Sequence, residues 1–295
     1  MFVKAISYWA FPGGLEGTAP MAKVFKDAKK LGYEAVEPAV AEAGSLHVKT
    51  SECECKEILA QAKDAGVRVE SLATGLYWAY SLTSSKASVR KKAEDYTRRM
   101  LQIARWLKVD GLLVVPGAVD VFFDPDAEVV DYDEVYKRAL QAMKKLSKTA
   151  EKLKVSICIE NVWNKFLYSP LEFRDFIDAV NSRYVRAYFD VGNVVNFGYP
   201  EQWIRILGRR IKKVHLKDFK ISILGPELKK FKINTLCGFA TGFVDLGDGN
   251  VNWPAVMKAL RAIKYKGPLT AEMVPPTPGI LKRTSKAMNK ILKMR

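Results

Sequence analysis

The sequence contains few histidines and few cysteines: two and four, respectively, in 295 residues. The cysteines are Cys53, Cys55, Cys158 and Cys237, and only the first two lie close together. Disulfide-stabilised domains are small and dense in cysteine, and a zinc ribbon needs paired Cys-x2-Cys spacing. We therefore expect reduced thiols and no structural zinc site.

Long hydrophobic runs and linker-like segments are also missing. The N-terminal stretch "MFVKAISYWAFPGG" has one lysine and a short apolar segment, without the zones of a signal peptide or the length of a membrane span. No Pro/Gly/Ser-rich tract divides the chain. We expect a soluble, cytoplasmic protein that does not act at membranes, with residues 1–295 forming one domain.

Acidic residues are scarce relative to basic ones, with 32 Asp and Glu against 48 Lys and Arg, giving a net charge of +16. Such a surplus can indicate nucleic-acid binding. Here the basic residues are spread over helix-like segments such as 89–108 and 135–154, where charges alternate with apolar positions. We therefore expect no nucleic-acid partner, although the surplus would suit an anionic substrate such as a sugar phosphate.

Short apolar runs recur along the chain and alternate with helical patterns. The runs lie at 2–10, 33–40, 67–75, 111–117, 155–162, 185–193, 211–218 and 268–274. Alternating strands and helices predict parallel strands joined by helical crossovers. Eight such repeats in a chain of this length predict an α/β fold, a single (β/α)8 TIM barrel, rather than a doubly wound sheet with a second domain. Residues 219–250 are expected to form a long loop between strands seven and eight, over the C-terminal mouth.

Polar residues end five of these runs: Glu37, Glu160, Asp190, His215 and Glu272. Singly, each could be a helix cap, a solvated loop residue or a satisfied buried histidine. Together, carboxylates at one rim of a barrel would repel one another unless a cation were present. A divalent ion held by Glu160, Asp190, His215 and Glu272 would resolve this, and the donor set favours Mn²⁺, Mg²⁺ or Co²⁺. Glu37 is expected to bind a substrate hydroxyl or to pair with a lysine.

Several segments carry a resemblance to a known family. They are "CIEN" (158–161), "FDVGN" (189–193), "VHLKD" (214–218), "GDGNVNW" (247–253) and "LTAEM" (269–273). In this order they resemble the motifs of the xylose isomerase-like sugar phosphate isomerase/epimerase superfamily of TIM barrels. Within it, the sequence is most similar to the ketose 3-epimerases (D-tagatose, D-allulose and L-ribulose types) and to the L-ribulose-5-phosphate 3-epimerases.

The resemblance implies a chemistry. Glu160 and Glu272 would bind one divalent metal, Mn²⁺ in the first place, and also exchange the substrate proton, while Asp190 and His215 complete the metal site. The enzyme would be an isomerase, a carbohydrate 3-epimerase, that inverts C3 of a ketose or ketose phosphate through an enediolate. The resemblance also implies a homo-oligomer, a dimer or tetramer.

The residues expected to contact the substrate depart in part from the free-sugar enzymes. Asn193 stands where those enzymes usually have a histidine, and Lys217 with Asp218 stands where they carry an arginine. Tryptophans at or just past strand ends could stack on a sugar or simply pack. The full expected set is Glu37, Asn193, Trp9, Trp78, Trp163 and Lys217.

Other functions fit parts of this pattern. An aldose–ketose isomerase acting on a sugar phosphate or hydroxypyruvate would use the same metal site but move a proton between C1 and C2. Inosose dehydratase, in the same superfamily, is less favoured. Endonuclease IV-like DNA repair proteins share the barrel, but their three-zinc site needs several histidines and this chain has two. A non-catalytic sugar-binding barrel would not need all four rim residues.

Overall fold

The computed structural model describes residues 2–121, 123–221 and 242–294. Its main sheet has eight parallel strands in the order β4-β2-β1-β12-β9-β8-β7-β6. They are β1 (Val3–Ser7), β2 (Ala35–Glu37), β4 (Arg68–Val69), β6 (Gly111–Val114), β7 (Ser156–Glu160), β8 (Val185–Asp190), β9 (Ile211–Leu216) and β12 (Pro268–Ala271). Leu72, just after β4, forms a parallel bridge with Leu112 of β6 and so joins the two edge strands. The predicted TIM barrel is confirmed.

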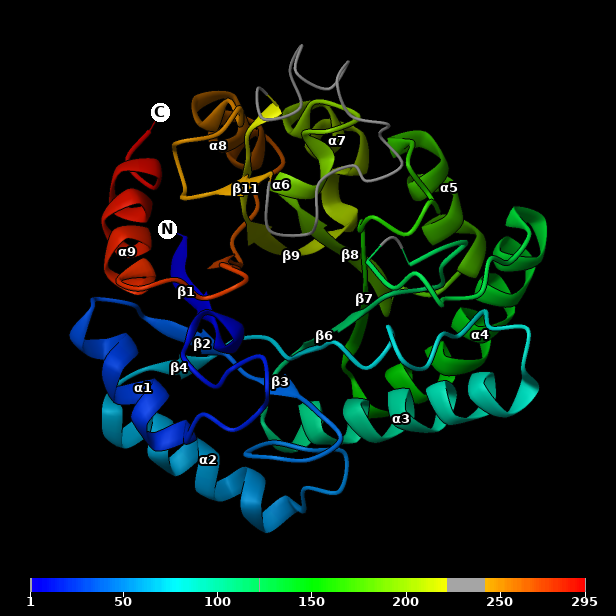
Figure 1. The fold of residues 1–295 in the computed structure, drawn as a ribbon, viewed down its shortest axis with the longest axis horizontal. Coiled ribbons are helices and arrows are strands. Elements are labelled where there is room, and N and C mark those ends of the chain that lie inside the picture. Colours follow the sequence, from blue (N-terminus) through cyan, green and yellow to red (C-terminus); the bar gives the residue numbers. More distant parts are fainter. Residues whose placement is uncertain (1, 122, 222–241, 295) are drawn as a thin grey trace.

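Helices surround this sheet on the outside (Figure 1). The longer ones are α1 (Met21–Lys30), α2 (Glu52–Ala65), α3 (Ala87–Trp106), α4 (Tyr132–Leu153), α5 (Pro170–Val180), α7 (Pro200–Leu207), α8 (Trp253–Ala262) and α9 (Ile280–Ile291). Helix α2 shows how local sequence sets their ends: Ser51 and Glu54 form a capping box, and Gly66 ends the helix in the left-handed conformation. Within the described ranges, no helix is long and apolar enough to cross a bilayer.

Two predicted strands are each interrupted. The run 33–40 divides at Pro38 into β2 and β3 (Ala39–Val40), and the run 67–75 divides into β4 and β5 (Ala73–Thr74). Proline has no N–H to donate to a strand ladder, so a continuous central strand cannot pass through it. β3 and β5 pair in parallel with each other above the main sheet, and they form one wall of the cavity described below.

The predicted strand 185–193 ends at Asp190. Its Oδ1 accepts a hydrogen bond from the backbone N–H of Asn193 at 2.8 Å and thereby caps the short helix α6 (Val191–Val194). Gly192 is required here, because a Cβ at this position would collide with the side chain and backbone of Lys217. The turn therefore packs directly against the end of β9.

The expected long loop is seen only in part, since residues 222–241 lie outside the described residues. Its two ends pair as β10 (Asp218–Phe219) and β11 (Phe243–Val244), which are antiparallel. Cys53, Cys55 and Cys158 are free thiols, and Cys237 falls within the part that is not described.

Candidate metal centre

The four predicted metal ligands converge at one end of the barrel. Glu160, Asp190 and His215 end or lie in β7, β8 and β9, and Glu272 follows β12, so neighbouring strands supply them in turn. His215 Nδ1 lies 3.0 Å from Glu272 Oε2, 3.4 Å from Glu160 Oε1 and 4.0 Å from Asp190 Oδ2. One potential ligand atom from each residue falls within 4.8 Å of all the others, and all four residues are buried.

The hydrogen bonding of these carboxylates fits a bound cation. Asp190 Oδ2 is buried and has no hydrogen bond, with Lys217 Nζ 3.4 Å away. Glu272 Oε2 is also buried, with Lys217 Nζ at 2.8 Å and His215 Nδ1 at 3.0 Å. A buried carboxylate oxygen without a hydrogen bond is costly, and a metal ion would compensate that cost. Three carboxylates and one imidazole are donors that suit Mn²⁺, Mg²⁺ or Co²⁺.

Glu37, expected to bind a substrate hydroxyl or to pair with a lysine, contacts His215, Ser71 and Tyr188 in this structure. Its Oε1 is 2.7 Å from His215 Nε2, and its Oε2 accepts hydrogen bonds from Ser71 Oγ at 2.5 Å and from the hydroxyl of Tyr188. Glu37 is fully buried and is not among the residues that line the cavity. An N–H donated from Nε2 to Glu37 leaves Nδ1 to face the carboxylates, which is the arrangement of a metal-binding histidine with an outer carboxylate.

Burial and neighbouring charges shift the pKa values within the cluster. Burial raises the pKa of Glu160 to about 7, with a further contribution from Glu272. Burial opposes ionisation of Glu272 too, but Lys217 and His215 outweigh it and hold the pKa of Glu272 at about 2. Burial also raises the pKa of Asp190, partly offset by Lys217. For His215, burial lowers the pKa, but the facing carboxylates Glu37 and Glu272 raise it well above its ordinary value.

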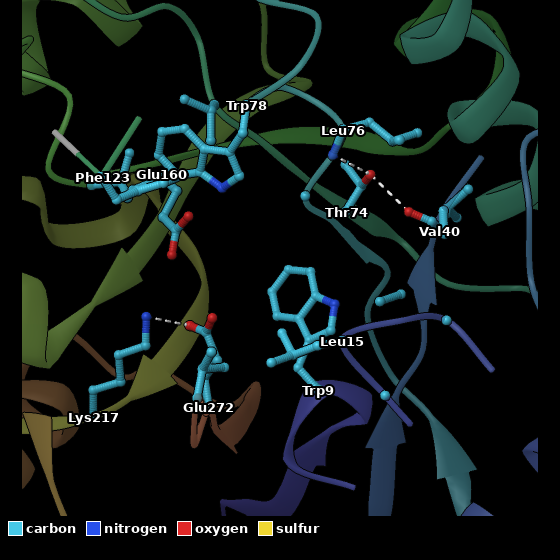
Figure 2. Close-up of a pocket in the computed structure, with 18 residues that line it drawn as sticks. Trp9, Leu15, Val40, Thr74, Leu76, Trp78, Phe123, Glu160, Lys217 and Glu272 are labelled. Atoms are coloured by element: carbon cyan, nitrogen blue, oxygen red, sulfur yellow. Dashed lines mark hydrogen bonds and ion pairs between the residues drawn. The ribbon is translucent and has the colours of Figure 1, made fainter. Parts of the chain in front are cut away.

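Lys217 brings a second cation into the cluster. Its Nζ lies 2.8 Å from Glu272 Oε2 and 3.4 Å from Asp190 Oδ2, and Figure 2 shows the ammonium directed at Glu272. Burial would lower the pKa of Lys217, but Glu272, Asp190 and Glu160 raise it. Lys217 was expected to contact the substrate; it lines the cavity, with its charge already paired to the carboxylates.

A cavity of about 540 Å³ opens next to the cluster. Glu160, Glu272 and Lys217 reach it on one side, and Trp9 and Trp78 also line it (Figure 2). The space is within the size range of small-molecule sites, roughly 300–1,000 Å³. Its position at the C-terminal ends of the strands is where TIM barrels carry their active sites.

Two other residues expected at the substrate lie elsewhere. Trp163 donates its indole N–H to the carbonyl of Asn193 at 2.8 Å and stacks on Phe243 at 5.1 Å between ring centroids. Asn193 donates its side-chain N–H to the carbonyl of Asn161 at 3.0 Å. Neither Trp163 nor Asn193 lines the cavity, because each fills its hydrogen bonds within the wall between β7 and β8.

The supporting roles of Asn161 and Asp218 were not predicted from the sequence. Asn161 holds the backbone of Asp190 by two hydrogen bonds, of 2.8 and 2.9 Å. Asp218 accepts four, from the backbone N–H groups of Phe219, Gly247 and Val251 and from the indole of Trp253, at 2.8–3.1 Å. Asn161 directly follows Glu160, and Asp218 lies three residues after His215. Their hydrogen-bond partners are distant in the sequence, so these supporting roles become visible only in the structure.

Comparison with known proteins defines the family. The family model described as "Xylose isomerase-like TIM barrel" matches residues 25–291. The chain therefore belongs to the xylose isomerase-like TIM-barrel family, in agreement with the motifs.

The relatives differ in the reactions for which they are named. An inosose dehydratase of Clostridium perfringens (strain 13 / Type A) is 24% identical over 269 residues, covering 87% of this chain and 88% of the relative. A putative L-ribulose-5-phosphate 3-epimerase of Shigella dysenteriae serotype 1 is 23% identical, covering 83% and 79%. With some relatives the chain aligns over only half their length, as with an inosose dehydratase of Clostridium perfringens (strain ATCC 13124) at 26% identity over 50% of each chain.

Solved structures support the same fold. A D-psicose 3-epimerase with D-tagatose from Clostridium cellulolyticum H10 superposes with a TM-score of 0.74 at 18% identity, covering 99% of each chain. A D-tagatose 3-epimerase-like protein superposes with a TM-score of 0.75 at 17% identity, covering 99% of this chain and 97% of that one. At these identities the likeness concerns the fold.

Proposed function

We propose that the protein is a divalent-metal-dependent epimerase that inverts C3 of a ketose, with Mn²⁺ as the first candidate metal. The observation that carries this proposal is the pair Glu160 and Glu272, two buried glutamates that reach one cavity from β7 and from the end of β12. In Figure 2 the two side chains lie on one side of the cavity and their carboxylates point toward each other. Inversion at a carbon atom needs one group to remove a proton and another to supply one from the opposite face.

Glu160, Asp190, His215 Nδ1 and Glu272 would hold the metal. When bound, the metal would supply a Lewis acid that acidifies the C–H bond next to the substrate carbonyl. One glutamate, as a carboxylate, takes the proton from C3, and the electron pair of that bond forms the C2–C3 double bond of an enediolate. The other glutamate, as a carboxylic acid, gives its proton to the opposite face of C3 while the C2 carbonyl re-forms. No atom is gained or lost overall.

A second candidate function is dehydration of a cyclic polyhydroxy ketone. The match to an inosose dehydratase over 87% of this chain favours it. The ammonium of Lys217, 2.8 Å from Glu272, also lies where it could donate a hydrogen bond to a departing hydroxyl. This reaction would begin with the same proton removal and end with loss of water. An aldose–ketose isomerase would use the same metal site but move a proton between C1 and C2, so both the C–H bond broken and the C–H bond formed would differ.

Proton exchange in D2O separates these reactions. Metal-stripped and Mn²⁺-restored protein would be incubated with ketoses, ketose phosphates and an inosose. Deuterium at C3 is expected; deuterium only at C1 or C2 would indicate an isomerase, and a new conjugated ketone absorbance a dehydratase.

Substitutions test the two glutamates. Glu160→Gln and Glu272→Gln should each abolish exchange at C3, because each removes one of the two proton-transfer groups. Glu57→Gln, at an exposed position on α2, is the matched control and should leave exchange unchanged. Exchange at more than a tenth of the normal rate in either active-site variant would refute the two-glutamate mechanism.

A further inference from the structure

The cavity has one charged end and one aliphatic end. What this difference indicates about the substrate rests on the proposed function. One end holds Glu160, Glu272 and Lys217, whereas the other is formed by Leu15, Val40 and Leu76. Figure 2 shows the charged groups on one side, with Trp78 next to Glu160, and Val40 and Leu76 across the cavity; Trp9 lies between the two sides, with Leu15 beside it. The reacting carbons of a substrate must lie at the charged end, so its remaining part lies against the aliphatic end.

The aliphatic end has little to offer a sugar hydroxyl. Its one polar side chain among the described lining residues is Thr74. The Thr74 hydroxyl donates to the carbonyl of Val40 at 2.9 Å and accepts from the N–H of Leu76 at 3.1 Å, so its one proton is used and one acceptor lone pair is left. A sugar hydroxyl buried here would lose its water and find at most one side-chain acceptor, and each polar group left unpaired would cost about 1–3 kcal/mol.

A phosphate group fits still less well. Among the described lining residues, Lys217 is the sole cation, and its ammonium is paired with Glu272 and Asp190 at the charged end. The other charged side chains in the lining are the carboxylates Glu160 and Glu272, which would repel a phosphate. A buried phosphate requires cationic or multiple N–H partners, and the aliphatic end presents no cationic side chain from the described residues.

The cavity is also larger than a simple ketose needs. If each of the twelve non-hydrogen atoms of a ketohexose took the space of a liquid water molecule, roughly 30 Å³, the sugar would fill about 360 Å³. That generous figure leaves about a third of the 540 Å³ cavity unfilled. The unfilled part would be at the aliphatic end.

We propose that the substrate is an uncharged keto-sugar carrying an apolar alkyl or aryl substituent on the end remote from the reacting carbons. The substituent packs between Leu15, Val40 and Leu76, while the polyol part stays with the carboxylates. Trp9 and Trp78 offer flat surfaces to the ring or chain that joins the two parts. Neither a free ketose nor a ketose phosphate makes use of the whole cavity.

Paired binding and exchange measurements test this. The probes are fructose and tagatose, each unmodified, as the 6-O-methyl ether, as the 6-O-benzyl ether and as the 6-phosphate, with Mn²⁺-loaded protein. The apparent Kd comes from quenching of tryptophan fluorescence, and exchange at C3 is followed in D2O. Each buried methylene group should lower Kd about fourfold. Kd should therefore be about fourfold lower for the methyl ether and at least tenfold lower for the benzyl ether than for the unmodified sugar. The 6-phosphate should bind more weakly than the unmodified sugar. The methyl and benzyl arms separate an alkyl from an aryl group.

The two readouts keep this inference apart from the proposed function. Tighter binding of the ethers without any exchange at C3 would overturn the proposed function and leave the substrate class standing. Ethers that bind within twofold of the unmodified sugars, or tighter binding of the phosphates, would overturn the substrate class even if exchange is rapid.

A substitution at the aliphatic end provides a second test. Leu76→Arg places a cation in that end, and the preference for benzyl ether over phosphate should fall at least tenfold. Leu171→Arg, at a half-exposed leucine of α5 outside the cavity, is the matched control and should leave the preference unchanged. An unchanged preference in the folded Leu76→Arg protein would also overturn the proposal.

Discussion

Replacing Glu37 tests how the metal centre is held in place. Glu37 accepts the hydrogen bond of His215 Nε2 at 2.7 Å and also those of Ser71 and Tyr188. In Glu37→Gln the amide oxygen can still accept from His215, but the negative charge that favours an N–H at Nε2 is gone. Loss of an outer carboxylate of this kind typically weakens metal binding by about 10–100-fold, or roughly 1.4–2.7 kcal/mol. We expect Mn²⁺ affinity to fall within that range.

The assay is isothermal titration of Mn²⁺ into the metal-stripped protein, with the free energy of unfolding measured in urea alongside. Glu34→Gln is the matched control, because Glu34 directly precedes β2 but its side chain is half-exposed. Its ion pair is with Arg68, at 3.6 Å, and not with His215. It should bind Mn²⁺ as the unmodified protein does. If Glu37→Gln folds normally and binds Mn²⁺ within twofold of the unmodified protein, Glu37 does not position His215 and the reasoning fails.

Three further predictions concern stability. Gly192→Ala should lower the free energy of unfolding by about 1–3 kcal/mol, because the new methyl group collides with Lys217; an unchanged urea midpoint would contradict the close packing. Asp218→Leu leaves four buried or part-buried donors without their acceptor and should cost at least about 4 kcal/mol, so a loss below 1 kcal/mol in the same assay would be inconsistent with that network. Mn²⁺ at a hundred times its Kd should raise the free energy of unfolding by about 2.7 kcal/mol, and Asp190→Asn should remove most of that gain; equal stabilisation of both proteins would place the metal elsewhere.

The barrel and the four clustered residues could be predicted because both depend on local pattern. Parallel strands bring their carboxyl ends to one edge, so polar residues such as Glu160 and Asp190 at the ends of apolar runs must meet there. The elements that differ from the prediction depend on hydrogen bonds of single residues. Pro38 divides a strand because it lacks an N–H, and Asp190 ends β8 early because its side chain caps the next turn.

The roles of the surrounding residues could not be read from the sequence. Glu37 and Glu272 both follow apolar strand residues, yet Glu37 is held beneath His215 by Ser71 and Tyr188, which come from distant parts of the chain. Trp163 likewise faces Phe243, on the far side of the long loop, rather than the cavity. Such contacts depend on how strands and loops meet in three dimensions, so they cannot be predicted from the spacing of residues within one segment.

The metal centre itself is tested most directly by diffraction from crystals grown with Mn²⁺, using anomalous scattering at the manganese edge. We expect one strong peak within ligand distance, about 2.0–2.3 Å, of carboxylate oxygens of Glu160, Asp190 and Glu272 and of His215 Nδ1. His215 Nε2 should remain hydrogen-bonded to Glu37. A peak bound by other residues, or no peak at saturating Mn²⁺, would contradict the central claim.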